Sequence, residues 1–399
     1  MLAWILGIVL FAIGICLSVA LHEAGHMWAA KAFGMKVRRY FIGFGPKIWS
    51  FRRGETEYGL KAIPLGGFCD IAGMTAMDEL TPDEEPRAMY RYPVWKRVTV
   101  MAAGILMQFV LGFVILYFAA ISVGLPNLGI KPIDAKATAP VVAQISPCVG
   151  ETDKGCPQGA PAPAKTAGLL AGDTITSVNG KPTKSWDDVK TEIAARSGPT
   201  PLTVSRGGQV VPLTVDVAKV NNAGAIGVRV VTPDQGPEMY HYNGLSGLGG
   251  AATFTGDLFA RTWEGLMRFP EKIPKVVEAI GGGERDKDTP VSVVGASVIG
   301  GDAVERGLWE LFLLLLASLN FFMGVFNILP LLPLDGGHIA IALYEKVRDT
   351  IRRLRGKPAG GPVDYTKLTG VTMVIVFIGA GIVLLTVTAD IVNPIRIGQ

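Results

Sequence analysis

The chain has few charged residues for its length. Only 18% of its 399 residues are Asp, Glu, Lys or Arg, whereas 49% are hydrophobic. Soluble domains usually carry about 25% charged residues, so an ordinary soluble protein is not expected. Charge is missing entirely from four stretches, which are residues 2–21, 98–125, 311–334 and 368–389. Each is near or above the roughly 18 residues that cross a bilayer as a helix, so we predict four transmembrane helices.

The first of these stretches lacks the features of a cleaved signal peptide. No basic residue precedes it, and the first lysine of the chain is Lys31. The apolar run continues into a His-Glu pair rather than into a small-residue cleavage site. We therefore expect a retained first span that continues as helix to about residue 33.

Basic residues are concentrated between the first and second spans (residues 36–97) and between the third and fourth (residues 346–367). Short loops rich in Lys and Arg face the cytoplasm. This predicts a multi-pass protein of the plasma (inner) membrane, with both termini and residues 126–306 outside. The lipid bilayer is its expected environment, and a net charge of +4 gives no reason to expect a nucleic-acid partner.

Cysteine is also scarce, with four residues in the chain. Cys148 and Cys156 both fall in the predicted exterior segment, close together in sequence. An oxidising exterior favours a local disulfide between them, and two free thiols are the alternative.

The predicted fold is an α-helical polytopic membrane protein with a small β-sheet and an inserted α+β domain. Alternating apolar and turn residues predict short strands within about 35–68, with a turn at Arg53-Gly54. Apolar residues at helical spacing between 244 and 280 predict an amphipathic helix, either on the membrane surface or packed on the inserted domain. In chain order we expect spans one and two (1–125), a linker (126–165), the inserted domain (166–220), an interfacial segment (221–306), and spans three and four (307–399).

The inserted domain has a recognisable pattern. The run AGLLAGDTITSVNG contains a strand and an Asn179-Gly180 hairpin signal, and a helix begins near Trp186. Alternating strands follow at 202–204 and 210–215. This pattern resembles a PDZ domain of the type found in bacterial proteases, and another small β-rich domain is the alternative.

The chemistry is carried first by His22-Glu23-Ala24-Gly25-His26, an HExxH motif. On a helix, His22 and His26 lie on one face and can bind one metal ion. Glu23 is placed to take a proton from a metal-bound water. Zn²⁺ suits two imidazoles, one carboxylate and a water. Because charged groups in a span are costly and usually functional, the motif carries more weight here than in a soluble chain.

A third ligand is expected from the segment NILPLLPLDGGH at 327–338. Asp335 would lie at the end of span three, on the same side of the membrane as HExxH. The two prolines must interrupt the helix there. Asp335 and His338 are both candidate ligands, and their spacing does not decide between them.

Together, HEAGH in the first span, the PDZ-like module and NILPLLPLDGGH resemble the site-2 protease family, in particular its RseP-like bacterial members with one PDZ domain. The resemblance implies one Zn²⁺ bound by His22, His26 and Asp335, with Glu23 as the catalytic base. It implies that the sheet at about 35–68 enters the membrane. It also implies substrate-binding roles for Asn327 and for Gly66 and Gly67.

The same resemblance implies an intramembrane zinc metalloendopeptidase that cleaves single-span membrane proteins such as anti-sigma factors. An upstream site-1-type protease would first trim these substrates, and the PDZ domain would exclude untrimmed ones. The alternatives are a transporter or channel lined by the polar residues, and a non-catalytic PDZ adaptor. A membrane HExxH protease with a Glu as its third ligand is a further alternative.

Overall fold

The computed structural model divides the chain into two compact units. One unit comprises Met1–Pro126 and Met239–Gln399, and the other comprises Asn127–Glu238. The structure describes residues 2–75, 78–129, 134–150, 156, 158–220, 223–231, 236–283, 285–286 and 289–397.

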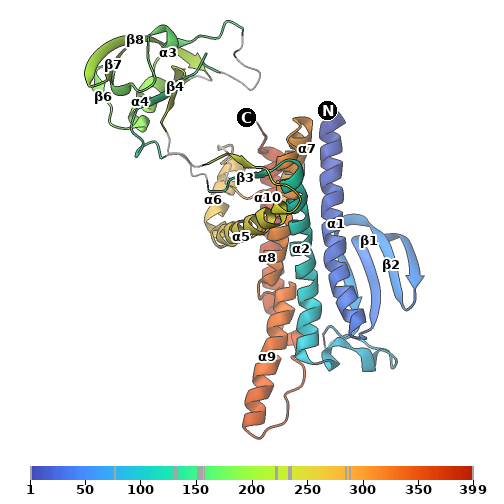
Figure 1. Cartoon of the computed structure of the whole chain (residues 1–399). Coiled ribbons are helices and arrows are strands. Elements are labelled where there is room, and N and C mark those ends of the chain that lie inside the picture. Colours follow the sequence, from blue (N-terminus) through green and yellow to red (C-terminus); the bar gives the residue numbers. More distant parts are fainter. Residues whose placement is uncertain are drawn as a thin grey trace. The chain divides into compact units, whose positions relative to one another are not determined.

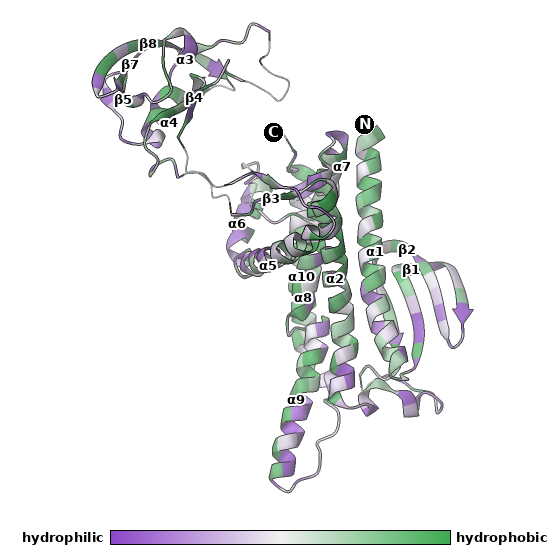
Figure 2. Cartoon of the chain, viewed as in Figure 1, coloured by the Kyte–Doolittle hydropathy of each residue, from purple (hydrophilic) through white to green (hydrophobic). Residues whose placement is uncertain are grey.

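Four helices of the first unit are long and apolar enough to cross a membrane. They are α1 (Leu2–Ala32), α2 (Val94–Ser122), α8 (Trp309–Ile328) and α10 (Thr369–Val392), the last preceded by the short 3₁₀ helix η3 (Tyr365–Leu368). Figure 2 shows that apolar residues dominate these helices. The prediction of four spans is confirmed, and the chain is a multi-pass membrane protein.

Small residues let the spans approach one another closely. A Cβ atom on Gly25 of α1 would lie 2.4 Å from the carbonyl oxygen of Ala103 on α2. A Cβ on Gly112 of α2 would similarly meet the ring of Phe321 on α8 at 2.7 Å. Such contacts are typical of helix packing inside membranes, where shape fit replaces the hydrophobic effect. They fix α2 between α1 and α8.

Two long bent strands follow α1. Strands β1 (Val37–Arg53) and β2 (Thr56–Ile71) are antiparallel and turn at Gly54, whose φ of +62° suits the turn predicted there. Phe41 pairs with both Phe68 and Gly59, so each strand contributes two segments to the sheet. Their order is 67–71, 37–42, 56–60 and 49–53. The strands extend beyond the short pieces predicted within 35–68.

The sheet is attached to the first span. The Tyr40 hydroxyl donates a hydrogen bond of 2.6 Å to the carbonyl oxygen of Ala20 on α1. Figure 1 shows the sheet beside the lower half of α1. The loop after the sheet contains two short 3₁₀ helices, η1 (Glu85–Arg87) and η2 (Met89–Arg91).

The end of the third span differs from the prediction. Span three was expected to run to residue 334 and to carry Asp335 at its end. Instead α8 ends at Ile328, and a separate helix, α9 (Asp335–Leu354), begins at Asp335. Pro330 and Pro333 have no backbone N–H to continue a helix, so the chain turns between them. The basic segment predicted as a loop from 346 lies largely within α9.

Three further helices precede α8. The amphipathic helix predicted over 244–280 is two helices, α5 (Ser246–Met267) and α6 (Phe269–Ile280), and α7 (Val293–Glu305) follows. Helix α5 runs across α2 and α8 (Figure 1) and packs against both. The rings of Phe109 on α2 and Phe259 on α5 have their centroids 6.0 Å apart. Two short strands of this unit, β3 (Leu125–Pro126) and β11 (Met239–Tyr240), pair with each other.

The second unit is an α+β domain. Five strands form one antiparallel sheet in the order β6-β5-β7-β8-β9, and two further strands form a separate pair. The sheet strands are β5 (Thr174–Val178), β6 (Lys181–Pro182), β7 (Gly198–Arg206), β8 (Gln209–Val220) and β9 (Ala223–Ala225); the pair is β4 (Val142–Ile145) and β10 (Val228–Val230); the helices are α3 (Pro163–Thr166) and α4 (Trp186–Ala194).

This unit is wider than the predicted domain at 166–220. Its core includes Val142, which is 0% exposed, and Ile226, which is 4% exposed. The expected linker at 126–165 therefore contributes a strand and core residues. A disulfide joins Cys148 to Cys156 in the same segment. That the unit is a PDZ domain stays a prediction.

Candidate metal centre

Two histidines lie on one face of α1, as the HExxH spacing predicts. His22 is 8% exposed and His26 is 5% exposed. Nδ1 of His26 donates a hydrogen bond of 2.8 Å to the carbonyl oxygen of Val100 on α2. That bond places the ring hydrogen on Nδ1 and leaves Nε2 free to bind a metal.

Asp335 reaches the same point from the first turn of α9. A Cβ on Gly336 would lie 2.2 Å from the carbonyl oxygen of Ile328, and a Cβ on Gly337 would lie 2.7 Å from the backbone of Leu331. Contacts this short are not tolerated by any residue with a side chain. Both glycines of the LDGG sequence are therefore required by the turn that presents Asp335.

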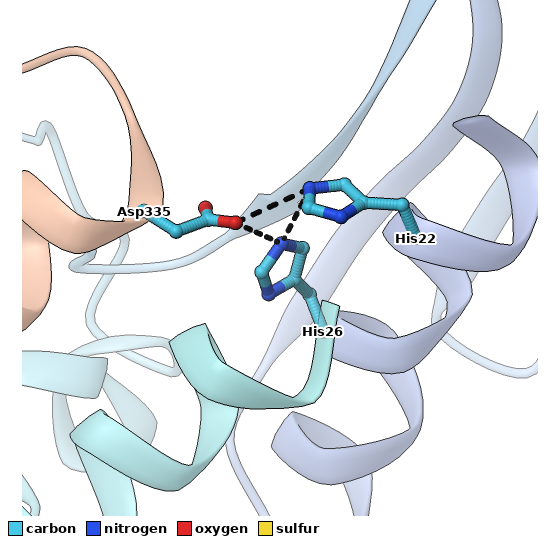
Figure 3. A group of neighbouring side chains, drawn as sticks. All are labelled: His22, His26 and Asp335. Atoms are coloured by element: carbon cyan, nitrogen blue, oxygen red, sulfur yellow. Dashed lines mark hydrogen bonds and ion pairs between the residues drawn. The ribbon is translucent and has the colours of Figure 1, made fainter. Parts of the chain in front are cut away.

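The three side chains point toward one another (Figure 3). Oδ2 of Asp335 lies 3.2 Å from Nε2 of His22 and 3.4 Å from Nε2 of His26, and the two Nε2 atoms are 3.2 Å apart. Ligand atoms at the usual distances from a tetrahedral zinc ion lie about 3.3 Å from one another. The three atoms therefore have the spacing of one face of a zinc coordination tetrahedron.

The donor set also fits a cation. All three atoms carry lone pairs and lie in a buried place, where such atoms repel one another unless a positive charge is shared between them. Two imidazoles and a carboxylate are ligands that zinc prefers. His22, His26 and Asp335 thus fit Zn²⁺ by chemistry, burial and spacing.

His338, the other candidate ligand, lies elsewhere. The metal-binding group that the described residues form contains His22, His26 and Asp335. Nδ1 of His338 lies 3.3 Å from the hydroxyl of Tyr365, and the two rings stack. The geometry therefore favours Asp335 over His338 as the third ligand.

Glu23 lies between the metal-binding group and the sheet. The backbone of Cys69 donates a hydrogen bond to the Glu23 carboxylate, whose charge interacts with His26, His22 and Asp335. A Cβ on Gly67 would lie 3.3 Å from Cγ of Glu23. Burial, reinforced by the charge of Glu23, raises the pKa of the Cys69 thiol. A raised pKa disfavours the thiolate, which is the nucleophilic form of cysteine.

The residues expected to bind substrate lie at different distances from this centre. Gly67 contacts Glu23, whereas a Cβ on Gly66 would meet the ring of Phe44 at 2.5 Å. The side-chain amide of Asn327 donates a hydrogen bond of 3.4 Å to Oε1 of Gln108. Asn327 is thus held by α2, near the turn that leads to Asp335.

Gly104 on α2 was missed by the sequence reasoning. A Cβ there would lie 2.3 Å from Nε2 of His26, so only glycine leaves room for the imidazole. The sequence shows only that Gly104 is a glycine inside an apolar helix, and such glycines usually mark a close contact with a neighbouring element. The sequence does not say against which side chain it packs.

Comparisons with known proteins agree with this site. The profile of "Peptidase family M50" matches residues 10–380. The chain is 50% identical to the zinc metalloprotease Rip1 of Mycolicibacterium smegmatis, and the match covers 99% of each chain. It is 45% identical to Rip1 of Mycobacterium tuberculosis, over 99% of this chain and all of that protein. A putative zinc metalloprotease of Mesorhizobium japonicum is 29% identical over 84% of this chain and 87% of its own length.

The family match includes both histidines, Asp335, all of α2 and α8, most of α1 and part of α10. A membrane-embedded protease of this kind acts on membrane proteins. The chain therefore belongs to peptidase family M50 and is a multi-pass, intramembrane zinc metalloprotease.

Proposed function

We propose that this protein cleaves peptide bonds within the membrane segments of single-span proteins, with anti-sigma factors as the expected substrates. An upstream site-1-type protease would trim these substrates first. The observation that carries the proposal is the meeting of His22, His26 and Asp335 beside Glu23, at the end of an apolar span. A hydrolytic centre in that place has access to a substrate helix lying in the bilayer.

The roles of the residues follow from their chemistry. A zinc ion bound by His22, His26 and Asp335 supplies Lewis-acid polarisation to the reaction. Glu23 takes a proton from the attacking water, whose oxygen adds to the scissile carbonyl carbon. Glu23 then gives that proton to the amide nitrogen as the carbon–nitrogen bond breaks. Water is consumed, and its second hydrogen stays on the new carboxyl group, so the products are a carboxylic acid and an amine.

The sheet offers a place for an unwound substrate. Segment 67–71 has a strand partner on one side, in segment 37–42, and Glu23 of α1 lies against its other side. A substrate added as a further strand would recover the backbone hydrogen bonds it lost on unwinding. Gly67, which has no side chain, leaves space for this approach next to Glu23.

The proposed orientation rests on charge. The basic residues of 36–97 and of α9 flank the ends of spans and favour the cytoplasmic side. We therefore propose that the metal centre faces the cytoplasm and that residues 127–238 lie outside. There the inserted unit would act as a PDZ filter that excludes substrates with bulky exterior domains.

Glu23→Gln tests the catalytic role. The substitution keeps the size of the side chain and removes its ability to accept a proton. We expect cleavage of a single-span substrate to fall below detection while one zinc ion per chain stays bound. Glu310→Gln, the same change in the first turn of α8, serves as the control and should leave cleavage intact. Normal cleavage by Glu23→Gln would contradict the role of Glu23 as the catalytic base.

Removal of the inserted unit tests the filter. The deletion should cover 127–238 rather than 166–220, because the core of the unit runs through both flanking segments. The shortened protein is expected to cleave a substrate with its exterior domain intact, which the full chain rejects. Rejection of that substrate by both proteins would refute the filter.

A further inference from the structure

Gln108 is a buried polar residue inside the second span. Its side chain lies on α2, and the residue is 1% exposed. Oε1 accepts the hydrogen bond from Nδ2 of Asn327 at 3.4 Å. Nε2 is buried and has no hydrogen-bond partner among the described residues. Gln108 therefore presents two amide hydrogens that no described residue pairs.

The position of Gln108 relates it to the metal centre. Gly104, one helical turn earlier, lies directly against the imidazole of His26. Residues four apart share a helix face and are separated by about 6 Å along the axis. The unpaired amide of Gln108 thus lies about one turn of helix from the ring that binds zinc.

An unpaired amide donor in an apolar span is costly, because no water is present there to replace the missing partner. A ligand that supplies a carbonyl oxygen would remove that cost. An unwound membrane segment supplies such oxygens, since its own helical hydrogen bonds have been lost. The donor on Gln108 is thus suited to a substrate backbone rather than to a side chain of the protein.

We infer that Nε2 of Gln108 donates a hydrogen bond to the carbonyl oxygen of the scissile peptide. Asn327 is then a positioning residue, which orients the Gln108 amide by donating a hydrogen bond to its Oε1. This inference rests on the function proposed above. It differs from the expectation that Asn327 itself contacts the substrate, because the amide of Asn327 is already directed at Gln108.

The hydrogen bond from Gln108 strengthens as negative charge develops on the carbonyl oxygen during attack by water. Its contribution should therefore appear in kcat more than in KM. No bond to Gln108 forms or breaks, and its protons stay on the amide. Glu23 remains the group that moves the proton.

The test is cleavage of a single-span substrate in detergent by Gln108→Met, which keeps the length of the side chain and removes the donor. We expect kcat to fall about 100-fold, as for other donors to a developing oxyanion, with KM and zinc content unchanged. Gln108→Asn keeps an amide donor and should retain more activity than Gln108→Met. Gln144→Met, the same change in strand β4 of the second unit, should cleave like the wild type.

A second arm tests the role of Asn327. If Asn327 acts through Gln108, Asn327→Ala lowers kcat in the wild-type background and has no further effect in Gln108→Met. Thermal unfolding and zinc analysis of every variant separate this result from misfolding. Three results bear against the account. Full activity in Gln108→Met, or equal effects of Asn327→Ala in both backgrounds, overturns the inference alone. Failure of the wild type to cleave any membrane segment overturns the proposed function and the inference with it.

Discussion

Replacement of Gly104 by alanine is expected to abolish tight zinc binding. The added Cβ would lie 2.3 Å from Nε2 and 2.4 Å from Cε1 of His26. Non-bonded heavy atoms settle at about 3.5 Å, so the imidazole must retreat by roughly 1 Å. Metal–ligand distances tolerate changes of about 0.2 Å, and the His26 ligand would therefore be lost. Substitution of residues that only hold the metal ligands in place lowers metal affinity by up to about 100-fold. Because a ligand itself is displaced here, we expect zinc affinity to fall by at least that much.

The same substitution should not weaken the helix that carries it. Alanine is favoured over glycine in a helix interior by about 1 kcal/mol, so a loss of zinc cannot be ascribed to unfolding of α2. Gly379→Ala on α10 is the matched control, because among the described residues no atom beyond the adjacent residues and the nearby backbone of α10 lies within 4 Å of the position of its Cβ. Zinc content is measured after dialysis against a graded series of chelator concentrations, together with substrate cleavage. Wild-type zinc affinity in Gly104→Ala would refute the packing argument.

Two further predictions concern stability. Arg97 on α2 and Glu345 on α9 form an ion pair of 2.5 Å, with side chains 8% and 6% exposed. Arg97→Met leaves the charge of Glu345 buried without its partner. This should lower the free energy of unfolding by about 3–5 kcal/mol. The double variant Arg97→Met with Glu345→Met should recover most of that loss in thermal unfolding, and a double variant no more stable than the single one would contradict this account. Cys148→Ser opens the loop closed by the disulfide with Cys156 and should lower the free energy of unfolding by about 2–3 kcal/mol. Chemical unfolding monitored in the segment 127–238 measures this, and an unchanged midpoint would show that the disulfide contributes nothing.

The spans and the two histidines were predictable because their signals are local. An uncharged run of about 20 residues is enough by itself to predict a transmembrane helix. His22 and His26 lie on one helix face because they are four residues apart. The turn at Gly54 is equally local, since it depends on a backbone conformation that glycine adopts easily.

The parts of the fold and the site that could not be predicted depend on contacts between segments far apart in the sequence. Asp335 was expected as a ligand only from the family resemblance, and its place at the start of a new helix depends on how the chain turns between Ile328 and Asp335. The roles of Gly104 and Gln108 arise from the crossing of α2 with α1 and α8, which no local pattern encodes. The extent of the inserted unit was underestimated for the same reason, because Val142 and Ile226 complete its core from outside the recognisable motif.

Zinc K-edge X-ray absorption of the purified wild-type protein and of Asp335→Ala tests whether His22, His26 and Asp335 bind one ion. We predict one zinc per chain with two imidazole nitrogens and carboxylate oxygen at about 2.0–2.2 Å, and loss of that oxygen signal or of the metal in Asp335→Ala. A spectrum unchanged by Asp335→Ala would show that α1 and α9 do not share the ion.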